Sequence, residues 1–251
     1  MTQLTFSRPA ACWEEALPLG NGRMGAMVFG GTAVERINLN EDTVWYGGFR
    51  NRVNKDARES LPRIRQLLRE DRIEEAEELA QLTLTGTPDG ERQYQSLCDL
   101  IVQSLDGDAP AGLHGMRWLG KTDMSPMEVE VSDYRRTLSL ETGVHTISYL
   151  RKGRRVRRES FLSAPHQVLA LRSEGYPCRV LLRRGMYVNR VEALDERTLL
   201  LEGRTGDNGV GYAALCRAVG AGVRVLGNTL LCPETFTLYI AASTSFREED
   251  Y

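Results

Sequence analysis

The sequence predicts a mainly β fold, a large antiparallel β-sandwich (supersandwich), with a small two-helix insertion near residues 55–83. Beyond residue 97, short runs rich in β-branched and aromatic residues recur between glycine, proline or charged turns, which is typical of many stacked strands. Within the insertion, the apolar spacing changes to a helical period. A chain of 251 residues with 41% hydrophobic side chains is long enough to bury one large core.

In the N-terminal part, the sequence pattern predicts two short strands, residues 24–30 and 33–39, around a Gly-Gly pair. Just before them, Asn21-Gly22 is a strong hairpin-turn signal, because both residue types tolerate positive φ angles.

The first helix is predicted from Ile64, Leu67 and Leu68, which fall at i, i+3 and i+4. Ser60 is expected to be its N-cap, with Pro62 tolerated in the first turn because proline lacks only an N–H that is unpaired there anyway.

The second helix is predicted to begin at Asp71, which stands three residues before Glu74, the spacing of a capping box. Ile73, Ala76 and Ala80 would form its narrow apolar stripe, opposite an acidic face. Glycine and proline in residues 85–90 end the helical region.

The rest of the chain is predicted as short strands, with one long loop at residues 106–126 that contains Trp118. Loops of this length inside a compact domain tend to be functional or mobile. The expected strands are 97–105, 127–132, 136–141, 144–151, 155–162, 167–173, 178–184, 198–203, 211–219, 222–226, 229–232 and 235–242.

Composition narrows the function classes. A net charge of −2 argues against general affinity for nucleic acid or anionic membranes. No apolar run approaches the ~20 residues that a membrane helix needs. The N-terminus lacks the basic and apolar segments of a secretion signal, so a cytoplasmic location is expected. Neither a metal nor a cofactor is expected, because the five scattered cysteines and three separate histidines show no ligand spacing; Trp13 is expected in the core.

Several short motifs follow one another in a fixed order along most of the chain. They are Leu17-Pro18-Leu19-Gly20-Asn21-Gly22-Arg23-Met24-Gly25-Ala26-Met27, Asn38-Leu39-Asn40-Glu41-Asp42-Thr43-Val44-Trp45-Tyr46-Gly47-Gly48, Leu61-Pro62-Arg63-Ile64-Arg65-Gln66-Leu67-Leu68, Glu75-Ala76-Glu77, Tyr94-Gln95 through Asp99-Leu100, Tyr134-Arg135-Arg136-Thr137-Leu138 and Arg158-Glu159-Ser160-Phe161. Together they resemble the N-terminal region of glycoside hydrolase family 95, the α-L-fucosidase and α-L-galactosidase family. One departure is Ser96-Leu97-Cys98, where the family usually has Pro-Leu-Gly after Tyr-Gln.

The resemblance implies that this chain is one domain of a larger enzyme, because proteins of that family are several times longer and place a helical (α/α) barrel after a β-rich N-terminal domain. Residues 1–245 are then the N-terminal β-sandwich domain, and residues 246–251 begin a linker to an absent barrel. The resemblance also implies that the general acid and the amide-activated water of an inverting mechanism lie beyond residue 251. No catalytic residue is therefore expected in this chain, whose partners would be its own barrel and a fucosylated or galactosylated oligosaccharide.

Substrate contacts in the complete enzyme are predicted for Asn21, Asn38, Asn40, Trp45 and Tyr46. Asn38 and Asn40 would share one face of a strand and bind hydroxyls, although turn-stabilising hydrogen bonds explain them equally well. The two aromatic residues would offer a platform to a sugar ring, or alternatively would be buried at a domain seam. The hairpin signal alone also explains Asn21.

Two tempting sites have simpler explanations. Glu41 and Asp42 are neighbours whose side chains point apart on a strand, so we expect Glu41 to bond the following loop and Asp42 to cap a turn, not to act as a glycosidase pair. The basic run at residues 151–158 is predicted to be a hairpin turning at Lys152-Gly153, with outward charges that protect a strand edge.

Three functional hypotheses follow. The first is the non-catalytic domain of an α-L-fucosidase-like enzyme, lending a loop to its barrel. The second is a self-standing carbohydrate-binding module that uses Trp45, Tyr46 or Trp118. The third is an interaction domain that binds protein or nucleic acid through the arginine hairpin, which steep salt dependence would reveal.

Overall fold

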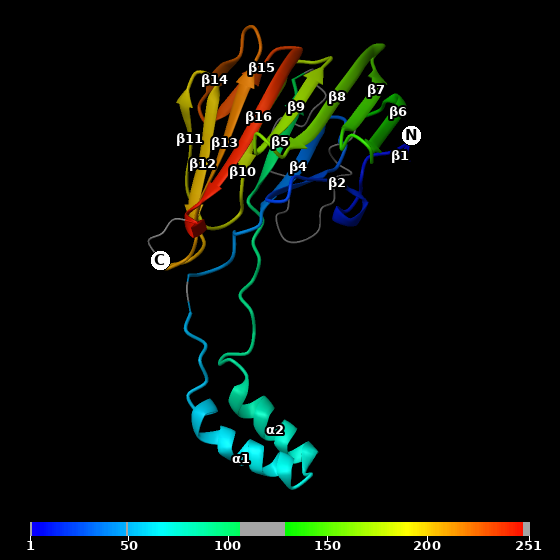
Figure 1. Ribbon diagram of the computed structural model, residues 1–251. Coiled ribbons are helices and arrows are strands. Elements are labelled where there is room, and N and C mark those ends of the chain that lie inside the picture. The colour runs from blue at the N-terminus through cyan, green and yellow to red at the C-terminus, as the bar shows by residue number, and fades with distance from the viewer. Residues whose placement is uncertain (1, 49, 106–128, 248–251) are drawn as a thin grey trace.

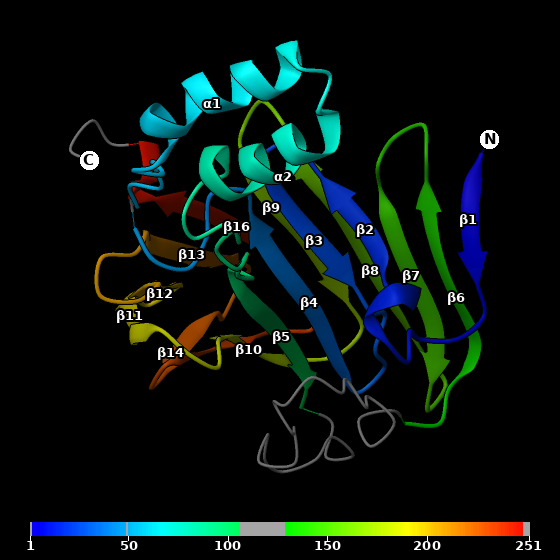
Figure 2. The ribbon, with the colours of Figure 1, turned by 90° about the horizontal axis from the view of Figure 1, so that it is seen from below.

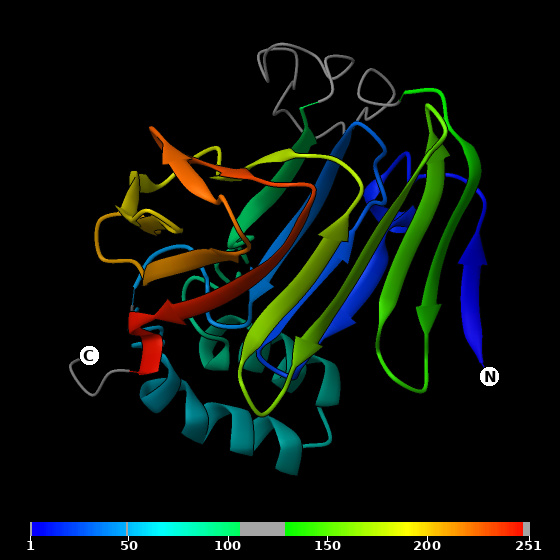
Figure 3. The same ribbon diagram turned by 90° about the horizontal axis from the view of Figure 1, so that it is seen from above.

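The computed structural model describes residues 2–48, 50–105 and 129–247. Over these residues the chain forms two antiparallel sheets that face each other, as Figures 1 and 3 show. The predicted β-sandwich with a two-helix insertion is confirmed.

The larger sheet has nine strands, and the smaller sheet has seven. In spatial order the larger contains β1 (Gln3–Phe6), β6 (Ser132–Ser139), β7 (His145–Arg151), β8 (Arg154–Ser163), β9 (Val168–Glu174), β16 (Thr235–Thr244), β13 (Gly211–Val219), β12 (Thr198–Arg204) and β11 (Val188–Asp195). The smaller contains β14 (Arg224–Leu226), β15 (Thr229–Cys232), β10 (Cys178–Arg183), β5 (Cys98–Ser104), β4 (Val34–Glu41), β3 (Met24–Val28) and β2 (Leu17–Gly20). Figure 2 shows β2 to β5 side by side in one layer.

The main core lies between the sheets and is built from the alternating inward residues of both. Leu39 of β4 and Leu100 of β5 are fully buried there, as are Leu201 of β12 and Ile240 of β16. All seven residues of β5 are buried, because this strand lies inside its sheet and is covered on both faces. Its central residues Leu100, Ile101 and Val102 are therefore apolar on both faces.

The insertion contains α1 (Ala57–Arg69) and α2 (Ile73–Leu84), which pack on each other through Ile64, Leu67 and Ala76. Figure 1 shows the helical pair below the sandwich, at the end of two extended segments that continue from β4 and return to β5. The segments are joined where the Thr87 amide donates to the Arg52 carbonyl at 3.0 Å. The insertion is therefore an outgrowth of the smaller sheet.

Both predicted helix starts are wrong. Helix α1 begins at Ala57, so Ser60 and Pro62 lie inside it. The cause is a turn that sequence periodicity does not report, in which the Asn54 side chain accepts from the Asp56 amide at 3.0 Å. Helix α2 has Arg72, not Asp71, at its N-cap position.

The β7–β8 hairpin turns at Lys152-Gly153 as predicted, with φ angles of 48° and 74°. Its predicted role at a strand edge is wrong, because β6 and β9 flank the pair and make both strands internal. Arg151 and Arg158 are buried, against the prediction of outward charges, whereas the other basic residues of the run are exposed as predicted: Lys152, Arg154, Arg155 and Arg157.

The other differences concern polar or edge segments. Residues 129–131 are not in a strand, whereas 127–132 was predicted as one, and β6 instead runs from Ser132 to Ser139. Strand β14 starts at Arg224, two residues later than expected. The sequence missed three edge strands, β1, β2 and β11. Strands β1 and β2 are only four residues long, and β2 contains a proline. No residue of β11 is buried, so it lacks the apolar face of an internal strand.

Trp13 was predicted in the core, but 49% of its surface is exposed. It lies in a short 3₁₀ turn, where few neighbours surround it. The predicted loop at 106–126, with Trp118 and His114, lies outside the described residues. Within the described ranges, no helix has the length and apolarity needed to cross a membrane.

Candidate functional site

A buried carboxylate organises one end of the sandwich, where β4 passes into the following loop. Glu41 is the last residue of β4 and is 1% exposed. Its Oε2 accepts hydrogen bonds from the Thr43 amide at 2.8 Å and from the Thr43 hydroxyl at 2.6 Å. The predicted role of Glu41 in bonding the loop is confirmed.

Arg23 places its charge on the same carboxylate. Its Nη1 lies 3.3 Å from Glu41 Oε1 and also donates to the Ala242 carbonyl of β16 at 3.0 Å. Its Nε donates to Gln167 Oε1 at 2.9 Å. Because β4 belongs to the smaller sheet and β16 to the larger, Arg23 ties the two sheets together at this end.

The turn between β2 and β3 delivers Arg23 to this position. Asn21 Oδ1 accepts from the amides of Arg23 at 3.1 Å and Met24 at 2.8 Å, and its Nδ2 donates to the Ser163 carbonyl. Gly22 adopts φ +91°, which a side chain would disfavour. The predicted Asn21-Gly22 hairpin turn is therefore confirmed, and it occupies the Asn21 side chain.

The loop that follows Glu41 is fixed to the larger sheet at several points. The hydroxyls of Thr43 and Thr244 lie 2.5 Å apart. The Thr205 hydroxyl donates to the Trp45 carbonyl at 2.6 Å, and the Gly47 amide donates to the Thr205 carbonyl, also at 2.6 Å. The backbone that carries Trp45 and Tyr46 is thus held from both sides.

Both aromatic side chains line an open cavity of about 430 Å³, which we call the aromatic cavity. Its lining residues are Trp45, Tyr46, Gly47, Gly48, Arg92, Val210 and Phe246. The Trp45 ring packs edge-on against Tyr94 at 5.3 Å between centroids, and its Nε1 donates to the Asp42 carbonyl. The cavity therefore joins four segments that are distant in sequence.

The two glycines of this cavity are needed for close packing. Gly47 has φ +71°, and a Cβ there would overlap the guanidinium of Arg92. A Cβ on Gly48 would overlap the Asn208 carbonyl. The glycine pair is therefore explained by backbone packing without any ligand.

The other predicted contact residues lie elsewhere. Asn38 and Asn40 do share one face of β4, the face turned away from the main core, as predicted. Asn38 is buried, and its Nδ2 donates to Asp99 Oδ1 at 2.9 Å. Neither asparagine lines the aromatic cavity, and neither does Asn21. Sequence reasoning placed only Trp45 and Tyr46 there, and it missed Arg92, Val210 and Phe246, which no local pattern marks.

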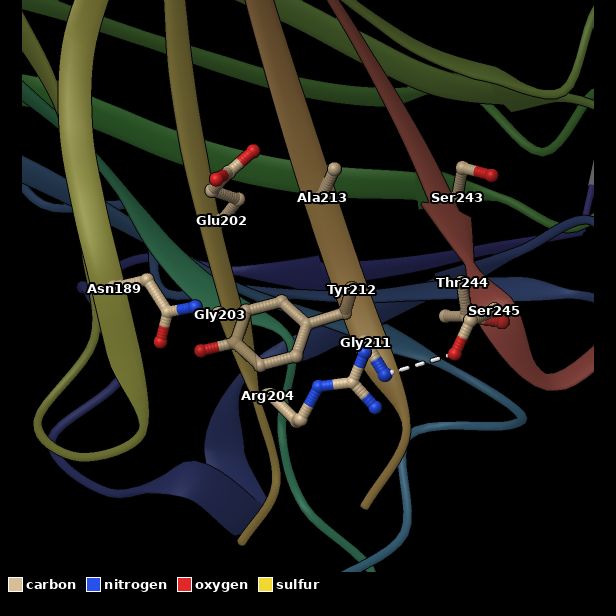
Figure 4. A pocket seen from close by; sticks show the side chains of 10 residues that line it. All are labelled: Asn189, Glu202, Gly203, Arg204, Gly211, Tyr212, Ala213, Ser243, Thr244 and Ser245. Atoms are coloured by element: carbon tan, nitrogen blue, oxygen red, sulfur yellow. Dashed lines mark hydrogen bonds between the residues drawn. The ribbon is translucent and has the colours of Figure 1, made fainter. Parts of the chain in front are cut away.

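A second depression, of about 310 Å³, lies near the end of the larger sheet (Figure 4). Three of its polar groups already have protein partners. Glu202 is paired with Arg190 at 2.7 Å, Arg204 Nη1 donates to the Gly209 carbonyl at 2.8 Å, and the Gly211 amide donates to Ser245 Oγ at 2.9 Å. This depression offers a ligand little unsatisfied hydrogen-bonding capacity.

A buried polar cluster lies around Glu35, away from these depressions. Glu35 Oε1 accepts from the Gly30 amide at 2.8 Å, and Arg158 Nη1 lies 3.7 Å from its Oε2. Burial raises the pKa of Glu35 to about 7, against the opposing effect of Arg158. Nearby His145 is also buried, and burial lowers its pKa to about 3.

Glu41 and Asp42 do not form an acid and base pair of the kind that cleaves glycosides. Both oxygens of Glu41 have internal partners, and the adjacent Asp42 is exposed. Over the described ranges, no three His, Cys, Asp or Glu side chains gather as metal ligands would. The aromatic cavity can bind and position a small ligand.

Comparison with known proteins gives consistent matches. Residues 4–249 match the family model for the N-terminal domain of glycosyl hydrolase family 65. Alpha-L-fucosidase 2 of Arabidopsis thaliana is 35% identical over 167 residues, which cover 66% of this chain and 17% of that protein. A probable alpha-fucosidase A of Aspergillus oryzae is 31% identical over 173 residues, covering 65% of this chain and 20% of that protein.

Among solved structures, a putative kojibiose phosphorylase from the human microbiome aligns with 93% of this chain and 27% of its own, at a TM-score of 0.43 and 10% identity. The matches to the two fucosidase relatives cover a fifth or less of the length of those relatives. The family match spans almost the whole chain. The chain therefore belongs to the family of glycosyl hydrolase family 65 N-terminal domains.

Proposed function

We propose that this chain is the non-catalytic N-terminal β-sandwich domain of an α-L-fucosidase-like glycoside hydrolase of the family 95 type. In the complete protein, a helical barrel would carry out inverting hydrolysis of terminal α-L-fucosyl or α-L-galactosyl residues. The proposal divides the chain into a sandwich domain, residues 1–245, and the start of a linker, residues 246–251.

One observation carries the proposal. The loop from Thr43 to Tyr46 is locked to both sheets through Glu41 and Thr205, yet it presents two partly exposed aromatic rings and no acid and base pair. A loop that is rigidly held but carries no acid and base pair suits a domain that positions substrate for a separate catalytic barrel. The similarity to proteins named as alpha-fucosidases supports fucosides as the substrate class.

The first experiment determines what the gene encodes after residue 251. A region with the alternating helices of a barrel is expected, and a stop without such a region would overturn the proposal. The chain 1–251 and the extended protein are then assayed with an aryl α-L-fucoside. We expect hydrolysis only by the extended protein, and turnover by chain 1–251 alone would refute the non-catalytic assignment.

A second experiment tests the loop. In the extended protein, Tyr46→Ala is expected to raise KM or lower kcat by on the order of tenfold, because misplaced substrate contacts weaken transition-state binding. Trp13→Ala is the matched control, since Trp13 is a similarly exposed aromatic residue outside the cavity. Equal kcat and KM values for both variants would show that the loop does not contribute to the active site.

A further inference from the structure

We propose that the aromatic cavity is itself a saccharide-binding site, which holds one pyranose ring against Trp45 and Phe246 while Arg92 donates hydrogen bonds to its hydroxyls. This inference rests on the proposed function only for the choice of sugar class. The site would work within the N-terminal domain and would not require the barrel.

The size and lining of the cavity suit a small ligand. Its volume of about 430 Å³ falls within the range of ~300–1,000 Å³ that is usual for small-molecule sites. Trp45, Tyr46 and Phe246 line it, with 37%, 38% and 52% of their surfaces exposed. Aromatic faces left open to solvent inside a concave site are suited to the apolar C–H face of a sugar ring.

Arg92 supplies the polar element. Its Nε is buried and has no hydrogen-bond partner among the described residues, and its Nη1 reaches the Tyr46 carbonyl only at 3.5 Å. The Nη groups of Arg92 carry four N–H donors and make only that one long contact among the described residues, so donors remain for an acceptor in the cavity. A guanidinium only donates, and sugar hydroxyls readily accept.

The site is also preorganised. The Trp45 carbonyl and the Gly47 amide are both bonded to Thr205, and the Tyr46 ring packs against Tyr187 at 5.6 Å between centroids. Ordering costs on binding are small when the binding groups are already held in place. A shallow site of this kind can therefore bind a small neutral ligand at millimolar concentration.

The lining also selects the ligand class. Among the described residues it contains one cationic side chain and no carboxylate, which disfavours cations. The guanidinium disfavours a purely apolar ligand, because that ligand would leave the donor unpaired. A neutral saccharide, with hydroxyls on its edge and C–H groups on its face, satisfies both parts.

The test titrates chain 1–251 with L-fucose, methyl α-L-fucopyranoside and D-galactose, up to tens of millimolar, while tryptophan fluorescence is recorded. Saturable binding by at least one of these sugars is expected. The change should vanish in Trp45→Phe and persist in Trp13→Phe, which removes a similarly exposed indole elsewhere. A change that persists in Trp45→Phe would place the ligand outside this cavity.

Affinity is then compared by NMR titration in Phe246→Ala and Arg92→Gln, which are expected to weaken binding by on the order of tenfold. Phe161→Ala is the control, because Phe161 is an exposed aromatic residue of β8 that does not line the cavity. Circular dichroism confirms that each variant is folded. Unchanged affinity in both cavity variants would overturn the assignment, as would the absence of binding by the parent chain.

The failures of the two proposals are distinguishable. If no sugar binds chain 1–251 while the extended protein hydrolyses fucosides, the cavity site is refuted and the proposed function stands. If a sugar binds but no barrel is encoded after residue 251, the binding site stands and the hydrolase assignment fails.

Discussion

Arg23 Nη1 lies 3.3 Å from Glu41 Oε1, and this contact joins the motif that begins at Leu17 to the motif that begins at Asn38. Glu41 is buried and the Arg23 side chain is 18% exposed, so water screens the pair only weakly. Arg23 also bonds to β16, and Glu41 also bonds to Thr43. One ion pair therefore connects the sheet packing to the loop that carries Trp45.

Removal of Arg23 should destabilise the sandwich and loosen this loop. Arg23→Met leaves Glu41 buried without its cation, and we expect a loss of about 2–4 kcal/mol in the free energy of unfolding. Urea unfolding measures this loss. In a cycle with Glu41→Gln, the double variant should lose less than the sum of the single losses, because the unpaired charge is then absent.

The control for this ion pair is Arg172→Met, which removes an exposed partner of Glu174 on the larger sheet. Exposed pairs contribute little, so a loss below ~1 kcal/mol is expected there. If Arg23→Met costs no more than this control, the Arg23–Glu41 contact does not hold the end of the sandwich together.

Glu35 should make stability fall as pH rises. Its pKa is about 7 in the folded chain, against an ordinary value of 4.5, because burial disfavours the charged form. Between these values the folded state holds a proton that the unfolded state has lost, so this contribution is full below pH 4.5 and disappears as pH passes 7.

Urea midpoints of the parent chain and Glu35→Gln, measured from pH 4.5 to 8, test this expectation. The difference between the two should change steadily in favour of the variant as pH rises, because glutamine never ionises. The groups around Glu35 include Arg158, Arg136, Tyr134 and Tyr149, and the guanidiniums stay charged throughout this range. Parallel midpoint curves would show that Glu35 does not titrate between the two states.

His145 should act in the opposite direction. Burial lowers its pKa from 6.5 to about 3, so below pH 6.5 the unfolded chain binds a proton that the folded chain excludes. Stability from this group is full above pH 6.5 and is lost as pH falls towards 3. At pH 5 the loss should be on the order of 2 kcal/mol relative to His145→Gln. Melting curves at pH 7 and pH 5 for both proteins would reveal it, and an equal shift in both would exclude it.

The helical pair should unfold on its own. Its small core depends on Leu67, which is 2% exposed, whereas its neighbour Leu68 is 50% exposed. Leu67→Ala is expected to cost about 2–3 kcal/mol within the pair, while Leu68→Ala should cost well under 1 kcal/mol.

Hydrogen exchange followed by mass spectrometry measures the local unfolding of each segment. In Leu67→Ala, faster exchange is expected in residues 57–84 only, with β4 and β5 still protected, because the helices pack mainly on each other. Exchange that rises equally across the sandwich would mean that the insertion and the sheets unfold as one unit.

Local patterns in the sequence account for much of the fold. The strands from β5 to β16, except β11, were found with small errors because short apolar runs are bounded by turn residues. The Asn21-Gly22 turn follows from the conformational freedom of that pair. The helical pair was found because apolar residues repeat at helical spacing in both helices, as in Ile64, Leu67 and Leu68 of α1. The start of α1 was misplaced because the Asn54 turn, not Ser60, sets it.

Tertiary structure decided what the local patterns could not. Arg158 reads as a surface charge in a basic run, but its strand is internal and its side chain is buried next to Glu35. Arg92 and Phe246 share a cavity with Trp45 only because the chain returns from the insertion beside the loop after β4 and because β16 ends at the same end of the sandwich. The sequence by itself determined strand, turn and helix propensities, which depend on neighbours along the chain; which side chains share a cavity or a buried charge depends on contacts between distant segments, and these exist only once the two sheets have packed.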